Sequence, residues 1–212
     1  MVNEIGARDT GRLATSIGAV AIGSAVSLAT YFAVGGPFGT INDIGNATIG
    51  VLSAGLAWRL RRQIPGRLAD VAAGAALVGA AVATVGSALV VSGTTGWFLA
   101  GLVSSVGFAG IGAWLACLCL RGDVAPATPR GLRALGIAAG SLMVLGLTAA
   151  PGIPLRLDDA STAPAWAWIG SAGWLGIYVV YPAWAIGFGV RLLRHVGQGA
   201  VQVAGRSPSR AS

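Results

Sequence analysis

The sequence contains no lysine, one histidine and two cysteines, and these absences exclude several kinds of chemistry. Without a lysine the chain cannot hold retinal through a Schiff base. The single histidine, His195, follows the last apolar stretch and lies among arginines, so it cannot ligate a haem or pair with a serine inside a membrane helix. Cys117 and Cys119 would point to different sides of a helix, which excludes a shared metal site or an intrahelical disulfide. We therefore predict no catalytic residues, no metal ligands and no cofactor.

Charged residues are also scarce, at 10% of the chain. A soluble domain carries about 25% charged residues, so this sequence cannot cover a water-exposed surface. Hydrophobic residues make up 55% of the chain and the mean hydropathy is +0.76, which predicts an integral membrane protein. The lack of lysine beside abundant alanine, glycine, valine and arginine is typical of GC-rich bacterial genomes, so the predicted location is a bacterial plasma (inner) membrane.

Six apolar stretches are long enough, or nearly long enough, to cross a bilayer. They run over 13–35, 41–58, 69–91, 97–120, 132–150 and 165–190. A helix of about 20 apolar residues spans the hydrocarbon core, whereas barrel strands show about ten residues of alternating polarity. The prediction is an all-α integral membrane protein with six transmembrane helices in three hairpins over 1–195. Residues 196–212 are predicted to form a disordered basic cytoplasmic tail.

The arginines are distributed unevenly between the two predicted sides of the membrane. Six alternating helices would place thirteen of the fourteen arginines on one side, and only Arg156 on the other. Cytoplasmic loops of membrane proteins are enriched in arginine and lysine, so both termini are predicted to be cytoplasmic. The net charge of +7 is then an orientation signal and not a sign of nucleic-acid binding. We expect the same arginines to contact anionic lipid headgroups.

Short sequence similarities suggest that a helical hairpin has been duplicated. A Gly-Ser pair stands in the first, third and fifth stretches, and an Ile-Gly pair in the second, fourth and sixth. The pairs are Gly23-Ser24, Gly86-Ser87, Gly140-Ser141, Ile49-Gly50, Ile111-Gly112 and Ile186-Gly187. Between the first two hairpins the Gly-Ser offset is 63 residues and the Ile-Gly offset is 62. Because the chain has 34 glycines, both duplication and chance explain these matches.

The most polar segment near a predicted span is 36–48, which opens the second stretch. Asn42 and Asn46 are four residues apart and Asp43 lies between them, so a helix would bring them to one face. One hypothesis is a small-molecule or cation site, with Asp43 supplying the charge. The other is a helix start, because Thr40 and Asp43 have the spacing of a capping box. The helix-start hypothesis leaves Asn46 and Thr48 without a role.

The sixth stretch carries a second group of candidate residues. Trp174, Tyr178 and Tyr181 are spaced at i, i+4 and i+7, so they form one aromatic stripe, and Pro182 is expected to kink the helix directly after it. Such a stripe can pack against another helix or line a binding site. Together with Thr40, Asn42, Asp43 and Asn46, these three aromatic residues form the predicted binding site.

Two main functions are compatible with these features. The first is a non-enzymatic accessory, regulatory or assembly component that acts through lipids, a membrane protein partner or a second copy of itself. The alternative is a small solute or ion transporter or channel, with its polar site at the outer end of the second helix. An enzyme acting on a lipid or a cofactor is a third hypothesis, without a catalytic group of residues to support it.

Overall fold

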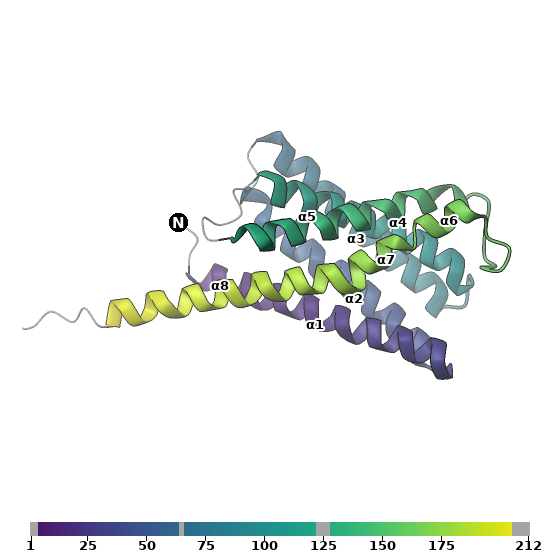
Figure 1. Ribbon diagram of the computed structural model, residues 1–212, viewed down its shortest axis with the longest axis horizontal. Coiled ribbons are helices and arrows are strands. Elements are labelled where there is room, and N and C mark those ends of the chain that lie inside the picture. The colour runs from purple at the N-terminus through teal and green to yellow at the C-terminus, as the bar shows by residue number, and fades with distance from the viewer. Residues whose placement is uncertain (1–3, 64–65, 122–127, 205–212) are drawn as a thin grey trace, which may run out of the picture.

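The computed structural model describes residues 4–63, 66–121 and 128–204, and these contain helices and connections but no β-strand. The elements in chain order are α1 (Glu4–Val34), α2 (Phe38–Leu60), η1 (Arg61–Gln63), α3 (Arg67–Val91), α4 (Trp97–Arg121), α5 (Arg130–Val144), η2 (Leu145–Gly152), α6 (Ala165–Ile169), α7 (Ala172–Leu175), η3 (Gly176–Val180) and α8 (Tyr181–Ala204). The predicted all-α class is confirmed. The elements form a bundle of long helical segments (Figure 1).

Five segments are long and apolar enough to cross a membrane: Gly6–Val34, Arg67–Val91, Trp97–Arg121, Arg130–Gly152 and Ala165–Gln198. Many large apolar side chains on their outer faces are exposed, including Val26 at 60% and Val78 at 65%, which suits contact with lipid. Five of the six predicted spans thus have candidate helices. The remaining one, α2, has 23 residues but carries two asparagines and an aspartate, which lower its apolarity. Its crossing of the membrane stays a prediction.

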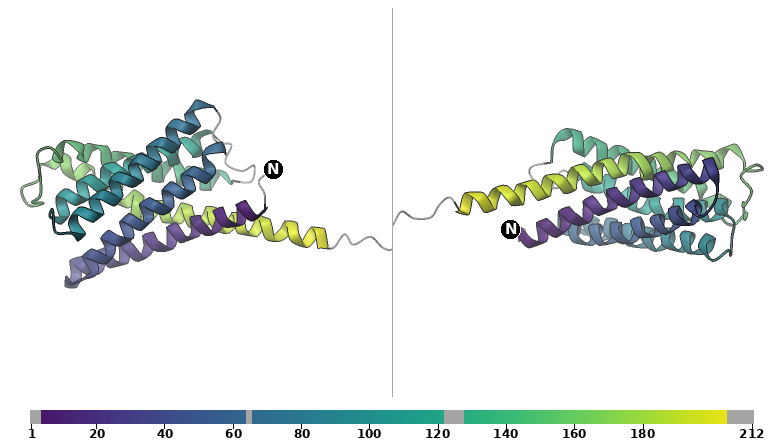
Figure 2. Two further views of the ribbon diagram at one scale, coloured as in Figure 1. Left: turned by 180° about the vertical axis from the view of Figure 1, so that it is seen from behind. Right: turned by 90° about the horizontal axis from the view of Figure 1, so that it is seen from below.

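Neighbouring helices in the bundle follow the order of the chain. Contacts join α1 to α2, α2 to α3, α3 to α4 and α4 to α5, and α8 returns to pack against α1 and α5 (Figures 1 and 2). The core is built from large side chains with less than 2% exposure, among them Phe108, Trp114, Tyr181 and Trp184. This arrangement holds the start of α2 beside α1 on one side and α3 on the other.

Glycine and alanine bring α3 and α4 into close contact. A side chain at Gly79 would collide with the carbonyl oxygen of Gly107, and one at Gly107 would collide with the backbone of Ala83. In lipid there is no hydrophobic driving force for helix association, so membrane helices depend on such small-residue faces for close packing. Similar contacts occur between α4 and α5, where Gly112 and Gly140 face each other.

The last helical segment is interrupted before it becomes regular. The backbone N–H of Ser171 donates to the carbonyl of Trp168, and the N–H of Trp174 donates to the carbonyl of Ser171. Each bond spans three residues, so the chain turns more tightly there than in an α-helix. A π-helical turn, η3, follows, in which the N–H of Tyr181 donates to the carbonyl of Gly176 five residues back. Pro182 has no N–H to donate, and the widened turn directly before it accommodates this loss. The kink expected at Pro182 stays a prediction.

The C-terminal helix continues further than the sequence suggests. The predicted tail begins at residue 196, whereas α8 ends at Ala204 and extends past the N-terminal end of α1 (Figures 1 and 2). The segment therefore remains helical for nine residues of that predicted tail, and no proline interrupts it before Ala204. Residues 205–212, which make up the rest of the predicted tail, lie outside the described residues.

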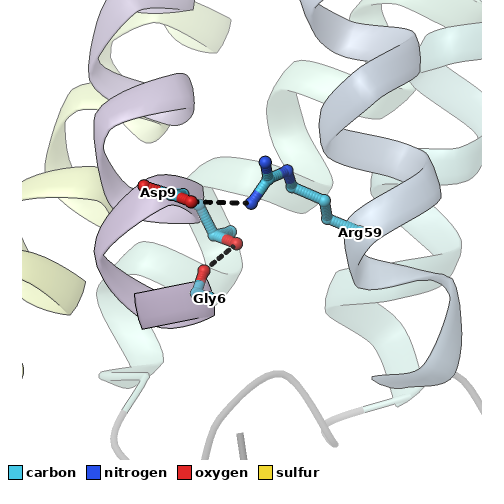
Figure 3. A network of polar contacts seen from close by, with 4 residues as sticks. Gly6, Asp9 and Arg59 are labelled. Carbon is cyan, nitrogen blue, oxygen red and sulfur yellow. Dashed lines mark hydrogen bonds and ion pairs between the residues drawn. The ribbon is translucent and has the colours of Figure 1, made fainter. Parts of the chain in front are cut away.

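The arginines of the described residues gather at one end of the bundle, with Arg156 as the exception. We call this the arginine end; it comprises the starts of α1, α3 and α5, the ends of α2 and α4, and the second half of α8. Among the described residues, the ion pair found at this end joins Arg59 of α2 to Asp9 of α1 at 3.8 Å (Figure 3). Both side chains are nearly half exposed, so the pair contributes at most about 1 kcal/mol.

A long connection between η2 and α6 lies at the opposite end. Its Asp158 carboxylate accepts hydrogen bonds from the backbone N–H of Gly96 at 2.7 Å and of Leu99 at 3.2 Å, and so caps the start of α4. The neighbouring Asp159 accepts bonds from the hydroxyl and N–H of Ser161, which lower the pKa of its carboxyl. These hydrogen bonds therefore stabilise the turn at pH values above the usual aspartate pKa. The stabilisation is lost as the pH falls through the lowered pKa of Asp159.

Candidate functional site

The start of α2 differs from the predicted capping box. Gly35 and Gly36 turn the chain at φ of 69° and 76°, Pro37 is the N-cap, and no side chain caps the helix. Thr40 and Asp43 are the third and sixth residues of α2, so neither occupies a capping position. The helix-start hypothesis was wrong because Pro37, which lacks an N–H and has a φ suited to helices, begins the helix earlier than Thr40 would.

Instead, the asparagines of α2 form a hydrogen-bonded cluster with α1 and η3. The Asn42 amide donates to the carbonyl and hydroxyl oxygens of Ser24, at 3.0 and 2.9 Å, and to the Tyr178 hydroxyl at 3.1 Å. The Tyr178 hydroxyl donates to Asn46 Oδ1 at 2.9 Å, and the Asn46 amide donates to Asn42 Oδ1 at 3.2 Å. Asn42 and Asn46 are 4% and 7% exposed, so they serve to join three segments.

Gly45 makes this close approach of α1 and α2 feasible. A Cβ at Gly45 would lie 2.7 Å from the Ser24 hydroxyl, which is closer than real side chains approach. Ser24 in turn donates to the backbone carbonyl of Asn42 at 3.0 Å. The nearby Thr48 bonds its own helix, at the Ile44 carbonyl, and takes no part in the cluster.

Between this cluster and the end of the bundle opposite the arginines lies a cavity of about 190 Å³, which we call the Asp43 cavity. It is enclosed by the end of α1, the start of α2, the end of α3, the first half of α4 and the interrupted last segment. Its lining consists of Leu28, Tyr31, Phe32, Gly36, Gly39, Thr40, Asn42, Asp43, Asn46, Val90, Trp97, Gly101, Ser104, Ser105, Phe108, Trp174, Ile177 and Tyr178. Six of these residues are aromatic.

Asp43 is the lining residue that carries charge. Among the described residues its carboxylate has no hydrogen-bond or ion-pair partner, although the side chain is only partly exposed. Asp43 also borders a second, largely apolar groove of about 390 Å³ between α2 and α3. Ser87 lines that groove, and its hydroxyl oxygen is buried without a partner among the described residues. The carboxylate thus separates an aromatic cavity from a groove on the outside of the bundle.

Six of the seven predicted binding residues line the Asp43 cavity: Thr40, Asn42, Asp43, Asn46, Trp174 and Tyr178. Trp174 lies 3.4 Å from the Ser105 hydroxyl, to which its indole N–H donates. Tyr181 is different, because it is fully buried below the cavity and its hydroxyl shares a 2.8 Å hydrogen bond with Ser53. Tyr181 follows the π-helical turn and stacks on Trp184 in the bundle core, so it does not line the cavity with Trp174 and Tyr178.

Sequence reasoning missed the residues that α1, α3 and α4 contribute to the cavity. Tyr31 and Phe32 lie at the end of the first predicted span, and Trp97 lies at the start of the fourth, where aromatic residues are usually read as interfacial anchors. Phe32 and Trp97 meet edge to face with ring centres 6.2 Å apart at the cavity wall. No spacing in the sequence indicates that these two helix ends meet.

The described lining of the cavity offers one carboxylate, hydroxyl groups and aromatic rings, which are groups suited to binding. The described residues contain no group of three or more histidine, cysteine, aspartate or glutamate side chains placed to hold a metal ion. A carboxylate surrounded by aromatic rings and hydroxyl groups can attract a positive charge and contact apolar groups around that charge. Comparison of the chain with protein-family models, curated proteins and solved structures gives no match.

Proposed function

We propose that this multi-pass membrane protein binds a small organic cation in the Asp43 cavity, and that the cavity is the substrate site of a small transporter. The observation that supports this proposal is the unpaired Asp43 carboxylate within a cavity that has six aromatic residues in its wall. An ionised group at the depth of a membrane helix is costly, and such groups usually pair with a partner or face a functional cavity.

The cavity favours a particular kind of solute. Aromatic faces attract cations, most strongly where water is excluded, and a methylated ammonium group also buries apolar surface against them. The volume of about 190 Å³ suits a compact molecule. Neutral sugars would need many polar partners, whereas the amides of Asn42 and Asn46 are already used by Ser24, by Tyr178 and by each other.

The structure is closed between this cavity and the arginine end. The cluster of Ser24, Asn42, Asn46 and Tyr178 lies beneath the cavity, and fully buried side chains such as Trp114 and Trp184 fill the bundle further down. Transport would thus require the last segment to move relative to α1 and α2. Its π-helical turn and tight turns, placed beside the cavity, are where such a movement would take place.

Binding is tested with tetramethylammonium and, as a neutral molecule of similar shape, tert-butanol. The full-length protein in mild detergent is titrated while tryptophan fluorescence is followed, since Trp97 and Trp174 line the cavity. We expect the cation to bind and the alcohol not to. Asp43→Asn should weaken binding by roughly tenfold or more, because the carboxylate attraction is lost.

The matched control is Asp70→Asn, which neutralises an exposed carboxylate in the first turn of α3, at the arginine end. It should leave cation binding unchanged. Equal binding by the wild type and Asp43→Asn would contradict the proposed site. Uptake of the labelled cation into proteoliposomes then tests transport, and binding without uptake would contradict that part of the proposal.

A second function is favoured by the extension of α8 beyond the bundle (Figure 1). The end of α8, which reaches past its neighbours, offers a surface to another protein, in keeping with an accessory or assembly role. This is tested by affinity purification in native lipid. A partner retained by Asp43→Asn and lost when the chain is truncated after Gln198 would support this function, whereas repeated isolation of the solitary protein would count against it.

A further inference from the structure

A second site of defined chemistry lies at the arginine end, between α5 and α8. A groove of about 580 Å³, which we call the α5–α8 groove, is lined by Pro129, Leu132, Ile186, Gly187, Val190, Arg191, Arg194, His195 and Gln198. The α8 contributions recur every three or four residues, so they form one continuous face of that helix. The other wall comes from the start of α5.

The polarity of the α5–α8 groove changes along its length. The part nearer the middle of the bundle is apolar and contains Ile186, Gly187 and Val190, with Leu132 opposite. The part nearer the helix end is basic, with Arg191, Arg194 and His195 in succession on α8. Residue 187 is a glycine, and a Cβ there would lie 3.1 Å from Leu132, so a larger side chain would narrow the apolar part.

Among the described residues, the basic end of the groove has no counter-charge. Arg191 and Arg194 are exposed, form no ion pair with a described residue, and no carboxylate appears in the described lining. Elsewhere at the arginine end, Arg59 pairs with Asp9, and the Arg61 guanidinium lies 3.7 Å from the centre of the Trp58 ring. Within the described part of the chain, the two α8 arginines thus have no anionic partner and offer their charge to a bound anion.

We propose that the α5–α8 groove binds one anionic phospholipid. Its phosphate group would lie against Arg191, Arg194 and His195, and one acyl chain would follow Ile186, Gly187 and Val190 towards the middle of the membrane. The order of the groove, apolar inside and basic at the end, matches the order of chain and headgroup in a lipid. Basic pockets between membrane helices are suited to anionic headgroups. This proposal does not depend on the Asp43 cavity.

The experiment is native mass spectrometry of the full-length protein released from mixed micelles that contain phosphatidylglycerol or phosphatidylcholine with identical chains. We expect one phosphatidylglycerol to be retained in preference to phosphatidylcholine. The double variant Arg191→Gln, Arg194→Gln should weaken this retention by roughly tenfold or more. The control, Arg62→Gln with Arg67→Gln, removes the same charge at the same end, outside the groove, and should retain the lipid as the wild type does.

Two further arms separate a lipid from a free phosphate. Gly187→Leu, which fills the apolar part and leaves the arginines in place, should also weaken lipid retention. Excess inorganic phosphate should displace little of the bound lipid. The proposal is overturned if both arginine variants lose lipid equally, if the two lipids are retained equally, or if phosphate displaces the lipid while Gly187→Leu has no effect. The unfolding temperature of each variant shows whether it is folded.

Discussion

At the scale of single residues, Tyr178 connects parts of the chain that are far apart in sequence. Its hydroxyl accepts a hydrogen bond from Asn42 and donates one to Asn46, which ties η3 to α2 at the bottom of the Asp43 cavity. The last segment is irregular before its contact with the cavity and within it, so it depends on such side-chain bonds for its position. Tyr178 is therefore a positioning residue for the site.

Tyr178→Phe should reduce the free energy of unfolding by about 1 kcal/mol, because two hydrogen bonds between membrane helices are lost. Thermal unfolding in detergent, followed by circular dichroism, measures the change. Tyr31→Phe is the control, since Tyr31 lines the same cavity and its hydroxyl has no hydrogen bond to a described residue. A loss of stability as large in Tyr31→Phe would contradict the role given to the Tyr178 hydroxyl.

At the scale of secondary-structure elements, the contact between α3 and α4 depends on glycine. Gly79→Ala should reduce the free energy of unfolding by about 2 kcal/mol or more, because the added methyl group collides with the Gly107 carbonyl and pushes the helices apart. Gly74→Ala, in the same helix, meets nothing within 4 Å and should be neutral or slightly stabilising. Thermal unfolding of both variants makes the comparison, and equal effects would contradict the packing argument.

The connection 153–164 is attached to α4 by the Asp158 carboxylate. Asp158→Ala should cost about 1 kcal/mol, as expected for the loss of a helix cap, and Asp158→Asn should cost less because an oxygen acceptor remains. Proteolysis within the connection and thermal unfolding measure the two effects. Resistance to protease as high in Asp158→Ala as in the wild type would contradict the attachment.

At the scale of the whole molecule, the orientation and the crossing of α2 can be tested together. We expect Val34→Cys and Ser161→Cys to react with a membrane-impermeant maleimide from outside intact cells, and Arg62→Cys to react only after permeabilisation. The background for all variants replaces Cys117 and Cys119 with alanine. The expectation follows from the positive-inside rule and from α2 spanning the membrane. If Val34→Cys and Arg62→Cys were labelled from the same side, α2 would not cross.

Several features could be predicted from the sequence because they depend on local composition. Apolar length gives the helices, and the arginines mark one end of them, since each such signal is contained in a single segment. The convergence of Asn42, Asp43 and Asn46 follows from helical spacing alone. Phe32 and Trp97 could not be assigned to the cavity, because their meeting depends on how α1 and α4 pack. Pro37, in turn, moved the helix start away from Thr40.

The sequence by itself determined that this chain is apolar and helical and that its arginines belong at one end. These properties depend on the free energy of transferring side chains between water and lipid. The composition of each segment determines that free energy independently of the other segments. The tertiary structure alone decided that Asn42 and Asn46 are used in packing while Asp43 remains unpaired in an aromatic cavity. The same packing placed Arg191 and Arg194 beside α5. Which polar groups find partners depends on neighbouring helices, and this is where the candidate functions arise.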